Sequence, residues 1–434
     1  METPIHDFLL SYAKENPVRC HMPGGKQQPF DITEIEGADS LFESSGIIRQ
    51  SEENAAKLFG AGETLFSCGG STLAIQTMLA SAKTLYPNKN RVAASRYCHK
   101  SVIASCVLLG LEVDWIKADK FLSCEISPKN VMETIGNDTL CVFVQSIDYY
   151  GGECDIGAIS RVCKEKRVLL LVDNAHGAYK VFTHRHPLGL GADMTADSAH
   201  KTLPCITGCA YLHISENAPK KLMERAKELM GLFGSSSPSY LMLDSLDLCN
   251  RFIAENREWT QKVFEEIEQL KKKLEGIGYS LRKSDLMKVT IDACEYGYSG
   301  FELSEELRRR GVSAEYADGR YVVLLFSVGQ DMDDFQRVFI AAEGIKKRER
   351  KTYREPVFDI PLFALSAREA VLSETAEVDV RQAAGRVCGS ILCSCPPCVP
   401  VIMPGEVFTE EVVGVLKGYG VEKVRCVKGQ CGLG

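Results

Sequence analysis

The 434-residue sequence has no apolar run of transmembrane length and no excess of basic residues. A membrane-spanning helix needs about 20 consecutive apolar residues, so we expect no membrane partner. The 51 Lys and Arg residues against 58 Asp and Glu residues give a net charge of −7, which argues against a nucleic-acid-binding surface. The segment from Met1 to Asp7 also lacks the basic and apolar regions of a secretory signal. These absences predict a cytoplasmic protein that binds a small molecule.

Several motifs of other enzyme classes are missing as well. No G-x-G-x-x-G follows a strand and no G-x-x-x-x-G-K-[ST] is present, which argues against dinucleotide and P-loop nucleotide binding. H-E-x-x-H and G-x-S-x-G are also absent, which argues against zinc peptidases and hydrolases.

The 18 cysteines do not indicate a disulfide framework, because they are scattered through apolar segments such as 106–109 and 141–144. We expect reduced, buried thiols. Near the C-terminus, Cys393, Cys395 and Cys398 form C-x-C-x-x-C, but no paired C-x-x-C or histidine follows at a familiar zinc distance. We therefore predict no metal site and interpret these three thiols as part of a turn.

From about residue 61, short apolar runs alternate with helical patterns, as is typical of a parallel sheet covered by helices. The clearest strand candidates are 91–95, 140–145, 168–173 and 208–213. The sequence thus predicts an α/β fold with a mostly parallel sheet. Open sheets of this kind bind ligands at the carboxyl ends of their strands.

The second half of the chain predicts further domains. Apolar residues at spacings of three, four and seven indicate one long amphipathic helix over 252–277. A compact second α/β domain follows, with strands at 287–291, 313–316 and 321–326 and helices at 300–310 and 331–345. The charge run 346–351 is typical of a solvated helix end that leads into a linker, and 364–370 is helical. We predict an N-terminal segment (1–60), a large domain (61–280), a small α/β domain (281–351) and a C-terminal lobe (352–434).

The segment 66–72, followed by a helical pattern, has the composition of an anion cradle. Gly70 lets a backbone approach a ligand, Ser71 and Thr72 offer hydroxyls, and the first N–H groups of a helix favour an anion. A plain helix N-cap by Ser71 or Thr72 is the alternative interpretation.

Asp173 ends an apolar strand, and His176 follows three residues later. A carboxylate at the edge of an apolar sheet is costly unless a cation pairs with it. A protonated pyridine nitrogen would serve, whereas capping of the next helix is the alternative.

Lys201 lies in the segment 198–203 together with Ser198 and His200. A lysine at such a place is a solvated cation by default, but a cofactor aldehyde needs an amine nucleophile. His99 follows the predicted strand 91–95 and is placed to stack on a flat aromatic ligand. A satisfied core or cap histidine is the alternative.

In this order, the motifs resemble those of the Orn/Lys/Arg decarboxylases, pyridoxal-phosphate enzymes of fold type I, and among them the shorter bacterial forms. The resemblance covers nearly the whole chain. It is carried by the segments 21–26, 31–34, 37–41, 51–56, 58–61, 70–72, 99–101, 172–177, 198–203, 236–240, 396–400 and 404–406.

The resemblance implies a role for each matching residue. Lys201 forms the Schiff base with pyridoxal 5′-phosphate, Asp173 pairs with the pyridinium nitrogen, His99 stacks on the ring, and His176 lies near the other side or edge of the ring. The phosphate group is held at Gly70, Ser71, Thr72, Ser198 and His200. Enzymes of this fold usually share their sites across a dimer interface, so a homodimer or a larger homo-oligomer is implied, with Ser236 and Ser237 serving the partner subunit's cofactor.

The resemblance also implies a reaction, the decarboxylation of arginine, lysine or ornithine to the amine. Lys201 or a histidine protonates Cα after carbon dioxide leaves. A basic substrate needs an acid, and Asp31, Glu34 and Asp39 are the candidates. The family patterns differ at Gly25 and Tyr179, which replace histidines, at Asn174, which replaces an acid, and in the segment 395–398. Another pyridoxal-phosphate reaction and a catalytically idle binding protein remain alternatives.

Overall fold

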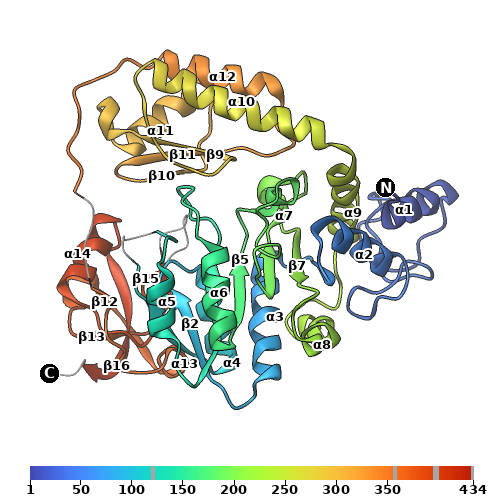
Figure 1. Cartoon of the computed structure of the whole chain (residues 1–434), viewed down its shortest axis with the longest axis horizontal. Helices are drawn as coiled ribbons and strands as arrows, with labels where there is room; N and C mark the ends of the chain where they lie inside the picture. Colours follow the sequence, from blue (N-terminus) through green and yellow to red (C-terminus); the bar gives the residue numbers. More distant parts are fainter. Residues whose placement is uncertain (119–122, 355–358, 394–399, 432–434) are drawn as a thin grey trace.

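The computed structural model describes residues 1–118, 123–354, 359–393 and 400–431. Three parts are visible in Figure 1: a central sheet with its helices, a smaller sheet above it, and a C-terminal lobe at its side. None of the helices in the described ranges is both long and apolar enough to span a membrane.

A seven-stranded sheet forms the centre of the protein, in the order β1-β7-β6-β5-β4-β2-β3. All neighbours from β3 to β6 are parallel, and β7 runs antiparallel to both β1 and β6. This confirms the predicted mostly parallel α/β fold. The strands are β1 (Glu63–Ser67), β2 (Arg91–Ser95), β3 (Glu112–Ile116), β4 (Thr139–Gln145), β5 (Leu169–Asp173), β6 (Met194–Asp197) and β7 (Ala210–Ile214).

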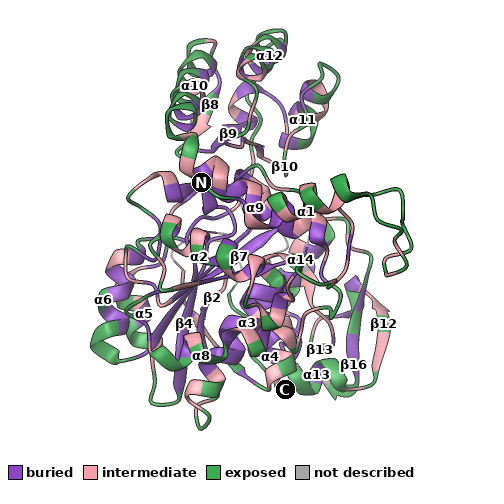
Figure 2. Ribbon diagram, turned by 90° about the vertical axis from the view of Figure 1, so that its right-hand side faces the viewer, coloured by how far each residue is buried: buried purple, intermediate pink, exposed green. Residues whose placement is uncertain are grey.

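Helices cover both faces of the sheet, which explains why its strands are apolar without alternation. Successive side chains of a strand point to opposite faces. The covering helices are α3 (Gly70–Leu85), α4 (Lys100–Leu109) and α8 (Lys220–Gly231) on one face and α5 (Pro128–Thr134) and α6 (Ile156–Lys166) on the other. In β5, Leu169 and Leu171 pack with α3 and α4, whereas Leu170 and Val172 pack with α5 and α6. Figure 2 shows the strands as a continuous buried layer.

The predicted long helix over 252–277 is wrong in its continuity. The chain forms α9 (Tyr240–Glu255) and α10 (Arg257–Gly276), separated at Asn256, whose φ of −114° and ψ of 34° are not helical. Asparagine favours such helix boundaries because its side chain competes for backbone hydrogen bonds, and here its Nδ2 donates to the Phe252 carbonyl. The remaining helices before residue 210 are α1 (Pro4–Glu15), η1 (Leu41–Glu43), α2 (Ile47–Phe59), η2 (Ala178–Phe182) and α7 (Ala199–Thr202).

The second sheet is antiparallel throughout, in the order β10-β11-β9-β8. The strand predicted at 313–316 is shifted, because pairing with β11 begins only at Tyr316, opposite Val323. Its elements are β8 (Ser280–Arg282), β9 (Lys288–Asp292), η3 (Cys294–Tyr296), α11 (Gly300–Arg308), β10 (Tyr316–Ala317), β11 (Tyr321–Leu325) and α12 (Met332–Glu343).

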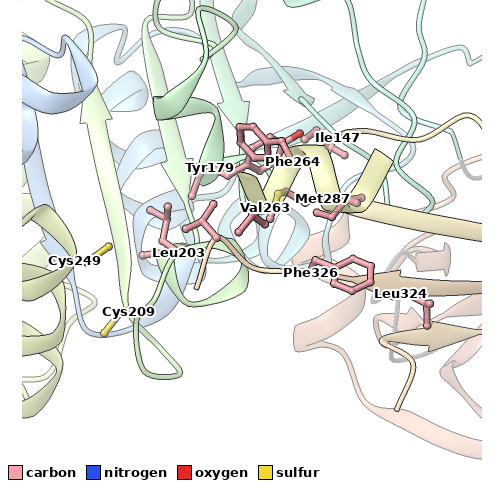
Figure 3. Close-up of a cluster of buried hydrophobic side chains, with 14 of the residues drawn as sticks. Ile147, Tyr179, Leu203, Cys209, Cys249, Val263, Phe264, Met287, Leu324 and Phe326 are labelled. Atoms are coloured by element: carbon pink, nitrogen blue, oxygen red, sulfur yellow. The ribbon is translucent and has the colours of Figure 1, made fainter. Parts of the chain in front are cut away.

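An apolar cluster fixes this second sheet onto the central one. Val263 and Phe264 of α10 lie among Tyr179, Met287 and Phe326 in Figure 3. The rings of Tyr179 and Phe264 meet edge to face, with centroids 6.0 Å apart. Leu203 belongs to the same cluster and ends the short helix α7, so the loop that carries Lys201 rests on this core.

The C-terminal lobe contains a three-stranded sheet, β12-β16-β13, and a two-stranded one, β14-β15. The helix predicted at 364–370 begins later, at Ala367, because Ser366 and Glu369 form a capping box there. The predicted thiol turn at Cys395 and Cys398 and most of the segment 396–400 lie outside the described residues. The lobe comprises α13 (Ala367–Leu372), β12 (Thr375–Asp379), η4 (Val380–Gln382), β13 (Arg386–Cys388), β14 (Leu392–Cys393), β15 (Pro400–Ile402), α14 (Glu410–Gly418) and β16 (Lys423–Cys431).

Candidate active site

A small pocket lies at the carboxyl ends of β2, β4 and β5, where a parallel sheet collects its functional groups. It gathers four residues that the sequence singled out as catalytic: His99, Asp173, His176 and Lys201. The other lining residues are Ser71, Tyr97, Gln145, Ile147, Tyr149 and Ala175.

Lys201 projects from α7, directly after β6, and its Nζ lies 3.1 Å from Nε2 of His176. Burial is the main reason that the pKa of His176 lies well below its ordinary value, and the Lys201 cation adds to this effect. His176 is therefore neutral at physiological pH and can accept a hydrogen bond from the lysine. The pair places an amine beside a neutral imidazole.

Asp173 lines the pocket and has 5% of its surface exposed. Burial raises the pKa of its carboxyl group, although the Ala175 N–H donates to Oδ1 at 3.0 Å and Lys201 lies nearby. A cationic ligand atom against this carboxylate would reverse that shift. Two further groups of the pocket, Gln145 Oε1 and His176 Nδ1, are buried and have no hydrogen-bond partner among the described residues. The pocket is thus suited to a polar, partly cationic ligand.

His99 is the N-cap of α4. Its Nδ1 accepts hydrogen bonds from the Ser101 N–H at 3.2 Å and the Ser101 hydroxyl at 2.8 Å. Burial, and then the charge of Lys201, lowers the pKa of His99 to about 4. The sequence left open whether this histidine is a cap or a stacking partner, and the structure gives it the first role while its ring lines the pocket. A neutral, fixed imidazole face is well suited to an aromatic ligand.

The residues of the predicted anion cradle lie at the start of α3. Gly70 has a φ of +66°, which favours glycine, and begins the helix. The Ser198 hydroxyl donates to the Ser71 hydroxyl at 2.9 Å, so the segment after β6 meets the N-terminus of α3. The Gly70 N–H donates to the Gly208 carbonyl, so the Ser71 and Ser198 hydroxyls and the later N–H groups of the first turn are what this helix start offers an anion.

Other predicted site residues lie outside the pocket lining. Thr72 is exposed, and His200 directs Nδ1 to the Cys209 carbonyl at 2.9 Å. Ser236 and Ser237 are exposed in the loop before α9. The three acids suggested for a basic substrate, Asp31, Glu34 and Asp39, do not line the pocket of this chain. Asp39 instead accepts backbone hydrogen bonds around the start of α2, from Gly46 and Ile48 among others.

Three lining residues, Tyr97, Gln145 and Tyr149, were missed by the sequence reasoning. Gln145 is the last residue of a predicted strand, and a polar residue at that position was a usable signal. The Tyr149 ring lies edge-on to His176 with centroids 5.0 Å apart, and its backbone N–H donates to the Tyr97 hydroxyl at 2.8 Å. No local pattern announces this contact between two loops.

Two of the residues that depart from the family pattern, Asn174 and Tyr179, make their hydrogen bonds outside the pocket lining. Asn174 is not a lining residue of the pocket. Its side chain accepts a hydrogen bond from Ser146 at 2.6 Å and donates one to Asp197 at 2.7 Å. The Tyr179 hydroxyl donates to Asp285 at 3.2 Å. Asn174 therefore does not remove a group from the pocket, and it serves a buried network beside it.

That network includes His186 and His213, whose ring nitrogens lie with an Asp197 oxygen within 4.8 Å of one another. Sequence reasoning did not identify this group, which has the residue types of a metal site. His186 Nε2 and Asn174 Nδ2 both bond to Asp197 Oδ2, at 3.0 and 2.7 Å. Among the described residues these hydrogen bonds give Asp197 Oδ2 two partners without an ion.

A larger cleft of about 1310 Å³ lies on the far side of the loop 147–152. Tyr150 and Gly151 line it, whereas Ile147 and Tyr149 of the same loop line the small pocket. Arg282 and Arg320 also face this cleft, but Lys201 and Asp173 do not. The four residues that the sequence singled out as catalytic therefore line the small pocket and not this cleft.

A lysine, a buried acid and neutral imidazoles at the carboxyl edge of a seven-stranded, mostly parallel sheet define the fold type I class of pyridoxal-phosphate enzymes. Comparison with known protein families then identifies the branch. The model of the Orn/Lys/Arg decarboxylase major domain matches residues 3–294, more than half of the chain, and the model of the C-terminal domain matches residues 348–419. The chain belongs to the Orn/Lys/Arg decarboxylase family, a family of amino-acid decarboxylases that are generally pyridoxal-phosphate-dependent.

Individual relatives agree with this assignment. The chain is 27% identical to an arginine decarboxylase of Bacillus subtilis over 460 residues, covering 96% of this chain and 93% of the relative. It is 21% identical to the lysine decarboxylase LdcA of Pseudomonas aeruginosa, covering 96% and 71%. The solved lysine decarboxylase A of Pseudomonas aeruginosa superposes with a TM-score of 0.82 at 18% identity, covering 98% of this chain and 80% of that one. The constitutive lysine decarboxylase of Escherichia coli gives a TM-score of 0.79 at 16% identity, covering 98% and 82%.

Proposed function

We propose that this chain binds pyridoxal 5′-phosphate through Lys201 and decarboxylates a basic amino acid, namely arginine, lysine or ornithine. The observation that carries the proposal is the buried Asp173 carboxylate, whose raised pKa calls for a cation in a pocket that also holds the Lys201 amine. The polar atoms Gln145 Oε1 and His176 Nδ1, unpartnered in the described structure, fit a polar ring in the same place.

Each residue then has a defined task. Pyridoxal phosphate, when bound, supplies an aldehyde that links covalently to an amine and a ring that accepts the electrons of the broken Cα–carboxylate bond. Asp173 keeps a proton on the ring nitrogen, His99 supports one ring face, and the start of α3 with Ser71 and Ser198 holds the phosphate. Lys201 would link to the cofactor aldehyde and, once the substrate amine has replaced it there, would deliver a proton to Cα; His176 Nε2, 3.1 Å from its Nζ, would exchange that proton.

A basic side chain needs a carboxylate other than Asp173, which the ring nitrogen occupies. The Tyr149 hydroxyl donates to Glu315 Oε1 at 2.7 Å, and the same ring contacts His176. Glu315 thus lies one phenol ring away from the pocket. Glu315 is exposed and, like the three acids suggested from sequence, lies outside the pocket lining, so we propose it beside Asp31, Glu34 and Asp39 as a candidate to receive the distal cation of the substrate.

Two alternatives stay distinct from this proposal. Another reaction on the same scaffold, such as transamination, aldol cleavage or elimination, would use the same cofactor residues. A catalytically idle homologue would bind the cofactor without turnover. Asn174 lies outside the pocket, which favours an active enzyme over the idle one, because the departure from the family pattern leaves the lining residues in place.

The decisive experiment supplies the loaded protein with each of the three amino acids and measures carbon dioxide and amine. We expect amine and carbon dioxide in equal amounts from at least one of them. Keto acid without carbon dioxide would contradict decarboxylation, and cofactor absorbance without any product would support the idle homologue.

Lys201→Ala tests the attachment point separately. This variant is expected to lose the visible absorbance of the lysine-bound cofactor and to show no measurable turnover. His200→Ala is the matched variant on the same short helix: it removes a residue implied to hold the phosphate but keeps the amine, so at saturating cofactor it should keep the absorbance. Visible absorbance that persists in Lys201→Ala would show that another amine carries the cofactor.

A homodimer or larger homo-oligomer forms part of the proposal, together with a cytoplasmic location. Exposure of Ser236 and Ser237 outside this pocket, beside Leu232, which is 71% exposed, supports a contact between subunits in this loop. Light scattering on purified protein tests it: a monomeric mass would contradict the shared site. The division at residues 60, 280 and 351 also stays a prediction, which limited proteolysis can test.

A further inference from the structure

A salt bridge joins the C-terminal lobe to the strand end that carries His99. Arg96 directly follows β2, and its Nη1 and Nη2 donate to Oε1 and Oε2 of Glu406 at 2.6 and 2.9 Å. The two residues are 310 positions apart in the sequence. The Arg96 side chain is 13% exposed and that of Glu406 is 0% exposed. A buried, two-pronged ion pair of this kind fixes direction as well as distance.

Glu406 is held firmly from its own side. Its Oε1 also accepts from the Trp115 indole at 3.1 Å, and its Oε2 accepts from the Met403 N–H at 2.7 Å. Arg96 makes a further bond to the Val401 carbonyl at 3.0 Å and stacks over the Trp115 ring at 4.7 Å. With these partners, neither charge has freedom to move without breaking several bonds.

The segment that Arg96 anchors enters the active-site pocket. Tyr97 and His99 both line it, and only Cys98 separates them. Tyr97 is 3% exposed, and its hydroxyl accepts from the Tyr149 N–H. A displacement of Arg96 would therefore reach His99 within three residues.

The C-terminal lobe also contacts the C-terminal end of α4, the helix that begins directly after His99. His99 is the N-cap of α4, and at its C-terminus Arg368 of α13 donates to the carbonyls of Val107 and Leu108, both at 2.9 Å. The last carbonyls of a helix lack partners within the helix, and a cation is favourable there. Figure 1 shows α13 beside α4 at the lower edge of the sheet.

We propose that Glu406 is a positioning residue: through Arg96 it holds Tyr97 and His99 in place, so the C-terminal lobe is a working part of the active site. Only the role of His99 toward the cofactor rests on the proposed function. A buried ion pair is weak evidence for stability, because hydrophobic pairs of similar volume often stabilise as well. Its geometric precision is what a stacking imidazole requires.

Glu406→Gln tests the proposal, with Phe408→Leu as the matched control. Phe408 is 1% exposed in the apolar core of the lobe and has no part in the Arg96 bonds. The chain has two tryptophans, so a Trp259→Phe background leaves Trp115 as the one tryptophan. Its fluorescence then reports on the clamp, by which we mean the contacts among Arg96, Glu406 and Trp115. In cofactor-free protein we expect Glu406→Gln to shift the Trp115 emission and the His99 imidazole resonance. Affinity for pyridoxal phosphate is expected to fall about tenfold, since small displacements at a site are costly.

A double variant separates position from stability. Arg96→Met with Glu406→Met leaves no lone buried charge, so its unfolding free energy should return toward that of the wild type. The His99 resonance and the cofactor affinity should stay altered, because the clamp is gone. Phe408→Leu should lower stability. It should leave the His99 resonance unchanged and the affinity for pyridoxal phosphate within twofold of the wild type.

Unchanged His99 resonance and affinity in Glu406→Gln would overturn the proposal. Equal changes in Phe408→Leu would also overturn it, because the lobe would then act through stability alone. A wild-type chain that fails to bind pyridoxal phosphate would instead contradict the proposed function, and the His99 resonance of the cofactor-free protein would still decide the question of the clamp.

Discussion

Two neighbouring strands, β5 and β6, end in aspartates whose pKa values are shifted in opposite directions. Asp173 is 5% exposed and Asp197 is 0% exposed, so both carboxylates are buried. Burial raises the pKa of Asp173, whose hydrogen bonds do not compensate for lost water. The pKa of Asp197 is lowered: burial alone would raise it, but His186, His213 and Asn174 together outweigh that effect.

Under the proposed function, this difference separates a functional acid from a structural one. Asp197 receives its stabilising contacts from side chains of the chain itself, including Asn174, the residue that directly follows Asp173. Asp173 faces the pocket, and we propose that a cationic ligand atom meets its carboxylate there. Carboxylates with perturbed pKa values concentrate at functional sites, whereas Asp197 Oδ1, which is buried without a hydrogen-bond partner among the described residues, lies outside the pocket lining.

The sharpest way to break the comparison is to neutralise each acid in turn. Asp173→Asn should lower the decarboxylation rate on the order of a thousandfold, as removal of a key electrostatic contact to the reacting group does. Its unfolding free energy should not fall, because the lost charge is an unfavourable one in the cofactor-free protein. Steady-state kinetics and urea denaturation measure the two effects.

Asp197→Asn is the control for that experiment. We expect it to keep its rate within about tenfold, since Asp197 is absent from the pocket lining, and to lose about 2 kcal/mol of stability through weaker charged hydrogen bonds. If both variants lost rate equally, the division between a functional and a structural acid would be wrong.

Asn174→Glu would place a second acid against Asp197. Nδ2 of Asn174 lies 2.7 Å from Oδ2 of Asp197, so a carboxylate there would meet a like charge beside the His186 ring. We expect a loss of about 4 kcal/mol in unfolding free energy, the range for an uncompensated buried charge. Adding Asp197→Asn should recover at least half of the loss. Losses that simply add would show that the two positions are not coupled.

The dependence of protein stability on acid pH gives a further test of the comparison, on the side of Asp197 and its neighbour His213. His213 is 0% exposed, and burial lowers its pKa from 6.5 to about 3, although Asp197 acts against this shift. Only the unfolded chain then takes up a proton as the pH falls from 6.5, so stability is full above pH 6.5 and decreases below it. At pH 4 the loss from this residue should be about 3 kcal/mol.

His213→Asn removes the titrating group, and Asn can still bond to Thr64, the partner of His213 Nδ1 at 2.8 Å. The dependence of stability on pH between 6.5 and 4 should become correspondingly shallower. An identical dependence in both proteins would mean that His213 titrates alike in the folded and unfolded chain.

The Asp173 side was predictable from sequence and the Asp197 side was not, for a physical reason. Lys201, Asp173 and His99 follow apolar strands, and the ends of parallel strands meet at one edge, so local pattern implies proximity. The contacts of Asp197 with His213 and of Arg96 with Glu406 depend on side-chain direction and on pairing between distant segments. The break at Asn256 and the shift of β10 are similar, since tertiary packing decides where an amphipathic pattern is interrupted.

The smallest expected effect concerns Glu315, the acid proposed to bind the distal cation of the substrate. If the substrate cation binds at Glu315, as proposed, Glu315→Gln should raise KM for the basic amino acid about tenfold with kcat nearly unchanged. Tyr149→Phe is the matched control: it removes the hydroxyl that bonds to Glu315 but keeps the ring against His176, so KM should rise less. An unchanged KM in Glu315→Gln would mean that the substrate cation is bound by another group, such as an acid of the partner subunit. Asp173 would then remain the sole acid of this pocket with a chemical task, and the contrast with Asp197 would become sharper still.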